Sequence, residues 1–191
     1  MQLTQARLAL TSAAVSLALT GIACQIDVGG PQPPAPPIAT PSSPADSMTA
    51  AWQSALTAAA TTHRLMIVLN EGQLTGFLTS RLEKQTNPVL SDAQVFLRQG
   101  QMRIFGVAQQ GPFRANVLVT IAPVLKPDGS IGFEVASADL GPIPAPDSVR
   151  ESLSAMLTEA FTGAIGSFAT GFRIQSLAIA NGELAIVGEL R

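Results

Sequence analysis

The chain has 191 residues, of which 47% are hydrophobic and 13% charged, so it has enough apolar material for a core and is not disordered as a whole. Its formal net charge of −2 argues against nucleic-acid binding, which requires clustered lysine and arginine. Its single cysteine excludes an intramolecular disulfide, so packing must hold the fold together.

Residues 1–23 have the organisation of a lipoprotein signal peptide. Arg7 gives a short basic start, and residues 8–22 form an apolar run that is too short to span a bilayer comfortably. The sequence Gly21-Ile22-Ala23-Cys24 resembles a bacterial lipobox, with Gly21 where leucine is usual. We therefore expect cleavage before Cys24, a lipid anchor on Cys24, and an extracytoplasmic protein tethered to the cell membrane. The alternative is an ordinary signal peptide with an incidental cysteine.

Residues 24–47 form a linker that carries the expected lipidated cysteine and seven of the fourteen prolines. Proline fixes φ and lacks a backbone donor, so this stretch cannot enter a helix interior or a central strand. We expect an extended, polyproline-like stalk, which at about 3.1 Å per residue could hold a domain up to roughly 70 Å from the membrane. A plain spacer that provides only clearance is the alternative.

Residues 48–191 are expected to form a single α+β globular domain. Residues 48–62 are rich in alanine and carry apolar side chains at helical spacing, which predicts a short N-terminal helix. The apolar run at residues 65–69 is rich in strand formers. A main helix should begin at Asn70, because Asn70 and Gln73 have the spacing of a capping box.

Strand-like segments follow that helix, joined by glycine-containing turns, and the last pair is turned by Asn181-Gly182, the strongest short hairpin signal. Before that pair, Ser148 and Glu151 have capping spacing, which predicts a second main helix with a broad apolar face. The predicted fold is an antiparallel β-sheet of about six strands in three hairpin-linked pairs with two main helices, in the order α-β-β-β-β-α-β-β. The strands are expected at residues 93–98, 101–109, 113–125, 130–140, 172–180 and 183–190.

Several cap and turn signals occur in a characteristic order between residues 65 and 190. They are Leu69-Asn70-Glu71-Gly72-Gln73-Leu74, Gln99-Gly100-Gln101, Pro127-Asp128-Gly129, Leu140-Gly141-Pro142-Ile143-Pro144 and Asn181-Gly182. In this order the chain resembles the YpmS-like and LmeA-like domains of bacterial envelope proteins. The resemblance implies an elongated α+β domain, related in shape to tubular lipid-binding folds, whose curved sheet wraps a long helix. It implies no catalytic residue.

Residues with catalytic potential are few. His63 is the only histidine, and its place after an alanine-rich helix favours an exposed end-of-helix role over catalysis. Three carboxylates, Asp128, Glu134 and Asp139, are better explained as solvated turn and strand residues than as a catalytic pair. The sequence therefore predicts no enzymatic activity, no metal site and no cofactor, and a hydrolase that uses His63 is the weakest hypothesis.

Five phenylalanines are candidates for the walls of an apolar groove that binds an acyl chain, although aromatic residues at such spacing can equally fill a core. The broad apolar face of the helix after Ser148 and the nearly continuous apolar run at residues 117–125 favour the groove. The main hypothesis is a lipoprotein that binds lipid or another amphiphile non-enzymatically. The alternative is an envelope scaffold or protein-interaction module with a filled core. The candidate groove residues are Phe105, Phe113, Phe133, Phe161 and Phe168.

Overall fold

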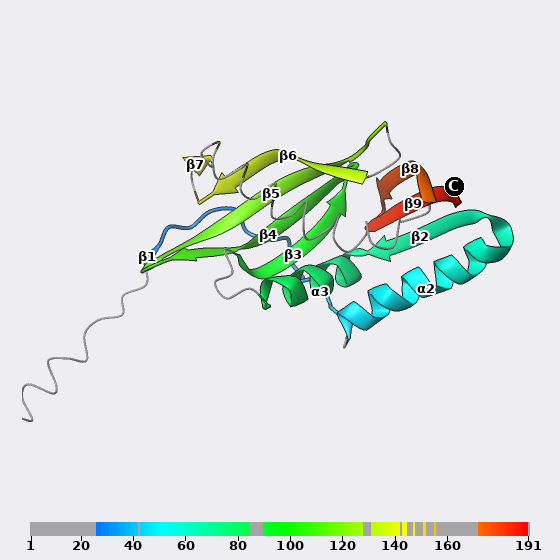
Figure 1. Cartoon of the computed structure of the whole chain (residues 1–191). Coiled ribbons are helices and arrows are strands. Elements are labelled where there is room, and N and C mark those ends of the chain that lie inside the picture. Colours follow the sequence, from blue (N-terminus) through cyan, green and yellow to red (C-terminus); the bar gives the residue numbers. More distant parts are fainter. Residues whose placement is uncertain are drawn as a thin grey trace, which may run out of the picture.

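The computed structural model describes residues 26–41, 43–84, 90–127, 131–141, 143–144 and 172–190, together with residues 147, 151 and 155. Cys24, the signal segment and most of the helix expected after Ser148 lie outside the described residues. The described elements, in chain order, are β1 (Ile26–Asp27), α2 (Pro44–Thr62), β2 (Arg64–Asn70), α3 (Glu71–Leu82), β3 (Ser91–Arg98), β4 (Gln101–Gln110), β5 (Phe113–Leu125), β6 (Ile131–Leu140), β7 (Ile143–Pro144), β8 (Phe172–Ala180) and β9 (Glu183–Leu190) (Figure 1).

Helix α2 starts at Pro44, four residues before the expected start, because proline is well suited to the first turn of a helix. The helix buries one stripe of side chains at helical spacing, formed by Met48, Trp52, Ala55 and Ala59. It ends at His63, which adopts a left-handed conformation with φ 58° and donates its backbone amide to the Ala59 carbonyl. His63 is therefore an exposed helix cap, as the sequence predicted.

Helix α3 begins with the predicted capping box. The Asn70 side chain accepts a hydrogen bond from the Gln73 amide at 2.9 Å, and the Gln73 side chain accepts one from the Asn70 amide at 3.0 Å. Both bonds satisfy amides that an uncapped helix would leave unpaired. The helix then buries Leu74, Phe77, Leu78 and Leu82 along one side.

The strands form two sheets. One has six strands, in which β3, β4, β5, β6 and β7 follow each other antiparallel and β1 adds to β5 in parallel. The other has three antiparallel strands in the order β2-β9-β8. The α+β class is confirmed. The prediction of a single, purely antiparallel sheet of about six strands in three hairpin-linked pairs is wrong, because β1, β2 and β7 are additional strands and β1 pairs in parallel.

Two long-range pairings account for the difference. The apolar run at residues 65–69 forms β2, which pairs with β9 over seven residues, from Arg64 with Glu189 to Asn70 with Glu183. Because of this pairing, the last hairpin, β8 and β9, forms a separate sheet with β2. Strand β1 lies beside the start of β5, where β6 has already ended, and its amides bond to carbonyls that β6 does not reach: Ile26 to Pro112 and Val28 to Arg114, both at 2.8 Å.

The proline-rich segment, residues 30–41, is called the strap here because it lies against the domain. Just before it, the Gly29 carbonyl accepts a hydrogen bond from the Asn116 amide at 2.9 Å. Near its end, the Ile38 amide donates to the Gln94 side chain at 3.4 Å. This differs from the expected stalk. Because prolines have no amide to satisfy, the strap can lie on the sheet without joining its ladder.

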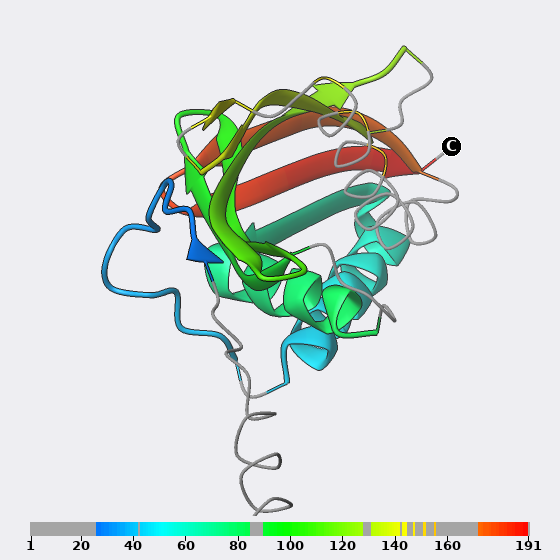
Figure 2. The ribbon, with the colours of Figure 1, turned by 90° about the vertical axis from the view of Figure 1, so that its left-hand side faces the viewer.

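Within the described residues, one apolar core connects both sheets with α2 and α3. The two sheets curve around a shared interior, with α2 and α3 on one side of it (Figure 2). Fully buried side chains come from every layer and include Trp52 of α2, Leu74 of α3, Ile67 of β2 and Ile121 of β5. This arrangement fixes α3 next to the edge of β3, where the candidate site lies.

Candidate functional site

The structure separates two of the phenylalanines that the sequence analysis placed in one groove. Phe105 pairs with Leu118 across β4 and β5, and Phe133 pairs with Pro123 across β5 and β6. Leu118 and Pro123 are an odd number of residues apart on one strand, so the two phenylalanines lie on opposite faces of the sheet. Phe133 belongs to the core, whereas Phe105 is buried on the outer face.

On that outer face Phe105 packs edge-to-face against Phe96, with ring centroids 5.4 Å apart and an angle of 86° between the rings. Phe105 is also the direct cross-strand partner of Gln94, to which the strap is bonded. The strap therefore crosses the face that carries Phe96 and Phe105. Both rings are buried there, so a role for Phe105 in ligand binding stays a prediction.

The remaining candidate phenylalanines do not complete a groove in the described part of the chain. Phe113 is exposed at the start of β5, whereas Phe133 of β6 pairs with Pro123 near the other end of β5. Phe161 and Phe168 lie outside the described residues, so a role for them in ligand binding stays a prediction.

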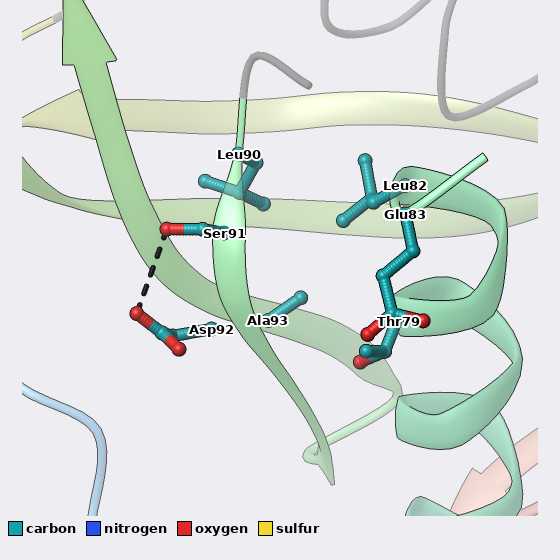
Figure 3. A pocket seen from close by; sticks show the side chains of 7 residues that line it. All are labelled: Thr79, Leu82, Glu83, Leu90, Ser91, Asp92 and Ala93. Carbon is teal, nitrogen blue, oxygen red and sulfur yellow. Dashed lines mark hydrogen bonds between the residues drawn. The ribbon is translucent and has the colours of Figure 1, made fainter. Parts of the chain in front are cut away.

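A different hollow, the α3–β3 groove, opens between the C-terminal half of α3 and the start of β3 (Figure 3). It has two adjoining lobes, with volumes of about 210 and 470 Å³. Both lobes are lined by Thr79 and Glu83 of the helix side and by Asp92 and Ala93 of the strand. The shared residues make the two lobes parts of one groove.

The smaller lobe has an apolar wall and a polar rim. Leu82 and Leu90 lie on its two sides, and Ala93 points toward the helix (Figure 3). Glu83 and Thr79 place oxygen atoms at the rim from the helix side. Asp92 turns its carboxylate away from the helix, toward the Ser91 hydroxyl at 3.5 Å. Asp92 also forms an exposed ion pair with Arg114 at 3.7 Å, which holds its carboxylate outward.

The larger lobe adds hydroxyl and amide groups, and the strap supplies its third wall. Its other lining residues are Ile38, Thr40, Pro41, Thr75, Gly76, Ser80 and Gln94. The strap therefore lines part of the groove as well as leading the chain to α2.

Two side chains of α3, Glu71 and Thr75, hold the helix against the edge of β3 next to the groove. The Thr75 hydroxyl accepts a hydrogen bond from the Val95 amide at 2.9 Å, and Glu71 Oε1 accepts one from the Leu97 amide at 2.7 Å. Glu71 also forms an ion pair with Arg98. Toward its start, β3 departs from regular pairing between Ser91 and Gln94, with φ 52° at Asp92. The groove lies beside this irregular part of the strand, which supplies Ser91, Asp92 and Ala93 to its lining.

The lining residues suit binding better than covalent chemistry. They include hydroxyls, the two carboxylates of Glu83 and Asp92, and apolar side chains, but no histidine or cysteine among the described positions. Within the same described ranges, no three His, Cys, Asp or Glu side chains gather as a metal site requires. His63, at the end of α2, is not among the groove residues.

The α3–β3 groove was absent from the sequence analysis. The sequence pattern that could have indicated it is the pair Thr75 and Thr79. These residues lie one turn apart on α3 and place two hydroxyls on a side that otherwise packs inward. Hydroxyls at this spacing are common on exposed helix faces. Only the position of β3 and the strap beside them reveals a hollow.

Comparisons of the chain with family models, with curated proteins and with solved structures find no match. The resemblance to YpmS-like and LmeA-like domains therefore stays a prediction. In the described part of the chain, neither helix has the combination of length and hydropathy that a transmembrane span requires.

Proposed function

We propose that this protein is an extracytoplasmic lipoprotein, anchored to the membrane through Cys24, whose domain binds a lipid or another amphiphile without catalysing a reaction on it. The observation that carries the binding part is the α3–β3 groove. It places an apolar wall, with Leu82 and Leu90, beside a rim of hydroxyls. A ligand with an apolar part and a polar part matches both sides.

The charge at the rim narrows the ligand class. Glu83 is the carboxylate that lies beside Thr79 at the rim, whereas the Asp92 carboxylate is turned away and paired with Arg114. A phosphate head group would meet repulsion from Glu83. An amphiphile with a neutral, hydroxyl-rich head or with a basic head is therefore favoured, and its polar groups would bond to Thr79 and Glu83.

The binding proposal is tested by native mass spectrometry of the full-length protein purified from cells in a mild detergent. We expect a co-purified amphiphile in the parent protein. Thr79→Arg should abolish it, because the long side chain fills the groove and pairs with Glu83. Thr57→Arg is the matched control, since Thr57 is an exposed threonine on α2, away from the groove, and it should retain the ligand. Equal ligand occupancy in both variants would contradict the groove as the site.

The anchor is tested separately. The parent protein should partition into the detergent phase, start at Cys24 after processing, and carry acyl chains on that residue. Cys24→Ser should remove the acylation. A parent protein that starts elsewhere and partitions into the aqueous phase would contradict the anchor, whatever the groove binds.

A scaffold or protein-interaction module is the second candidate, and one observation favours it. Met66 and Val68 are exposed on the outer face of β2, where their cross-strand partners are Val187 and Ala185. An exposed apolar sheet face is typical of a protein contact. Met66→Lys should disrupt a complex in the scaffold case and should leave amphiphile binding unchanged.

A further inference from the structure

Three large apolar side chains are exposed together at one corner of the six-stranded sheet. Ile26 is 49% exposed, Val28 43% and Phe113 52%. Large apolar residues scattered singly on a surface need no explanation, but a group does. We call these three residues the corner patch.

The backbone pairing places the three side chains on one face. Ile26 and Phe113 are direct partners in the parallel pair of β1 and β5. Val28 lies just after β1 and continues the pairing, because its amide bonds to the Arg114 carbonyl, so it lies on the same side as Ile26. The side chain of Asp27, between them, turns back to accept a hydrogen bond from the Gly29 amide at 2.9 Å, which keeps its charge off the patch.

The corner patch lies next to the attachment point of the lipid. Cys24 is two residues before Ile26, and two residues span at most about 7 Å. From Ile26 onward the chain is bonded to β5, so the distance from Cys24 to the domain is at most this short span. A lipid on Cys24 would therefore hold this corner, and no other part of the molecule, at the membrane surface.

We propose that the corner patch inserts into the lipid bilayer as a second membrane contact beside the acylated cysteine. This inference rests on the proposed acylation of Cys24. Stable anchoring to membranes commonly combines an acyl chain with a second signal, and exposed apolar side chains in the interface supply one. If the patch is inserted, the far end of β5 should lie outside the bilayer, because Leu125 is about 40 Å from Phe113 along the strand.

The experiment places a fluorescent reporter at each end of β5 in the acylated, full-length protein. The reporters are Phe113→Trp and, as the matched control, Leu125→Trp, a position on the same strand that is 41% exposed. The one natural tryptophan, Trp52, is buried in the core and gives a constant background in the parent protein. Each variant is reconstituted into vesicles of phosphatidylethanolamine and phosphatidylglycerol, with and without brominated acyl chains.

We expect Trp at position 113 to lose emission in brominated vesicles and to shift to shorter wavelength, and Trp at position 125 to be unchanged. Ile26→Trp, the cross-strand neighbour, should behave like Phe113→Trp and guards against a folding defect in either variant. Vesicle flotation is measured on the same samples. Protein that floats without bromine quenching at positions 26 and 113 overturns the patch while leaving the anchor intact.

Two other outcomes also count against the corner patch. A blue shift at position 113 that is already present in detergent-free protein without lipid, with no bromine quenching, would assign the patch to a protein contact. Protein that does not float overturns the acylated anchor itself and, with it, the patch that depends on it.

Discussion

Thr75 and Val95 join α3 to the edge of β3. The buried Thr75 hydroxyl accepts a hydrogen bond from the Val95 amide at 2.9 Å, a bond that a neighbouring strand would otherwise accept. Glu71 does the same for the Leu97 amide. Free strand edges invite pairing with other chains, and here side chains of a helix occupy the edge.

Thr75→Val should therefore destabilise the domain by about 1–3 kcal/mol, since it keeps the shape of the side chain and leaves the Val95 amide buried without an acceptor. Urea unfolding followed by circular dichroism measures the change. Thr57→Val, at an exposed threonine of α2, serves as the control and should cost no more than about 0.5 kcal/mol. A similar loss in both variants would mean that the Thr75 hydroxyl has no special part in holding α3.

Gly106 and Leu90 should be energetically coupled. A Cβ atom at Gly106 would lie 2.7 Å from Leu90 Cγ, so Gly106→Ala overpacks the core and should cost about 1–3 kcal/mol. In a Leu90→Ala background the new methyl group has space, and the same change should cost much less. A double-mutant cycle from equilibrium unfolding measures this coupling, and additive effects would contradict the close contact.

Gly72→Ala should loosen the strap. The added Cβ atom would lie 2.5 Å from the Ala39 carbonyl oxygen, so the strap must shift. Alanine usually strengthens a helix by about 0.5–1 kcal/mol relative to glycine, and the clash should reverse that gain. Hydrogen exchange at the Ile38 amide reports the strap directly and should become faster. Thr79→Ala, on the same helix, should leave this exchange unchanged, and protection at Ile38 that survives Gly72→Ala would show that the strap does not depend on this contact.

Phe133 and Phe113 should differ sharply in their contribution to stability. Phe133 is buried in the core, so Phe133→Ala should cost about 3–5 kcal/mol. Phe113→Ala removes an exposed ring and should cost less than about 1 kcal/mol. Thermal and urea unfolding of both variants test this. A mild effect at Phe133 would instead identify it as the wall of a ligand cavity, as the sequence hypothesis had it.

Local signals were sufficient to predict the ends of several elements. The capping box of Asn70 and Gln73 and the Asn181-Gly182 turn, with φ of 53° and 79°, both follow from the chemistry of a few adjacent residues. The same holds for the glycine turn at Gly100, where φ is 76°. Such features need no knowledge of the rest of the chain.

The sequence could not predict the features that depend on contacts between distant parts of the chain. The run at residues 65–69 reads as a strand, but its partner β9 lies more than 100 residues later, and no local pattern names that partner. Likewise, proline content predicts an extended strap but not that Gly72 leaves space for Ala39 beneath it. The α3–β3 groove depends on both, because α3 follows β2 directly and the strap forms one wall.

The pairing of β1 with β5 would also determine how the protein meets its partners if Cys24 is acylated. A long free tether would let the domain sample a hemisphere of solution around its lipid, whereas a domain bonded from the second residue after the cysteine would reach a much smaller volume. Ligands and partners would then have to arrive at, or travel within, the same leaflet. Encounter rates would then depend on the lateral density of both molecules. A longer chain between Cys24 and Ile26 would let the domain reach partners further from the membrane.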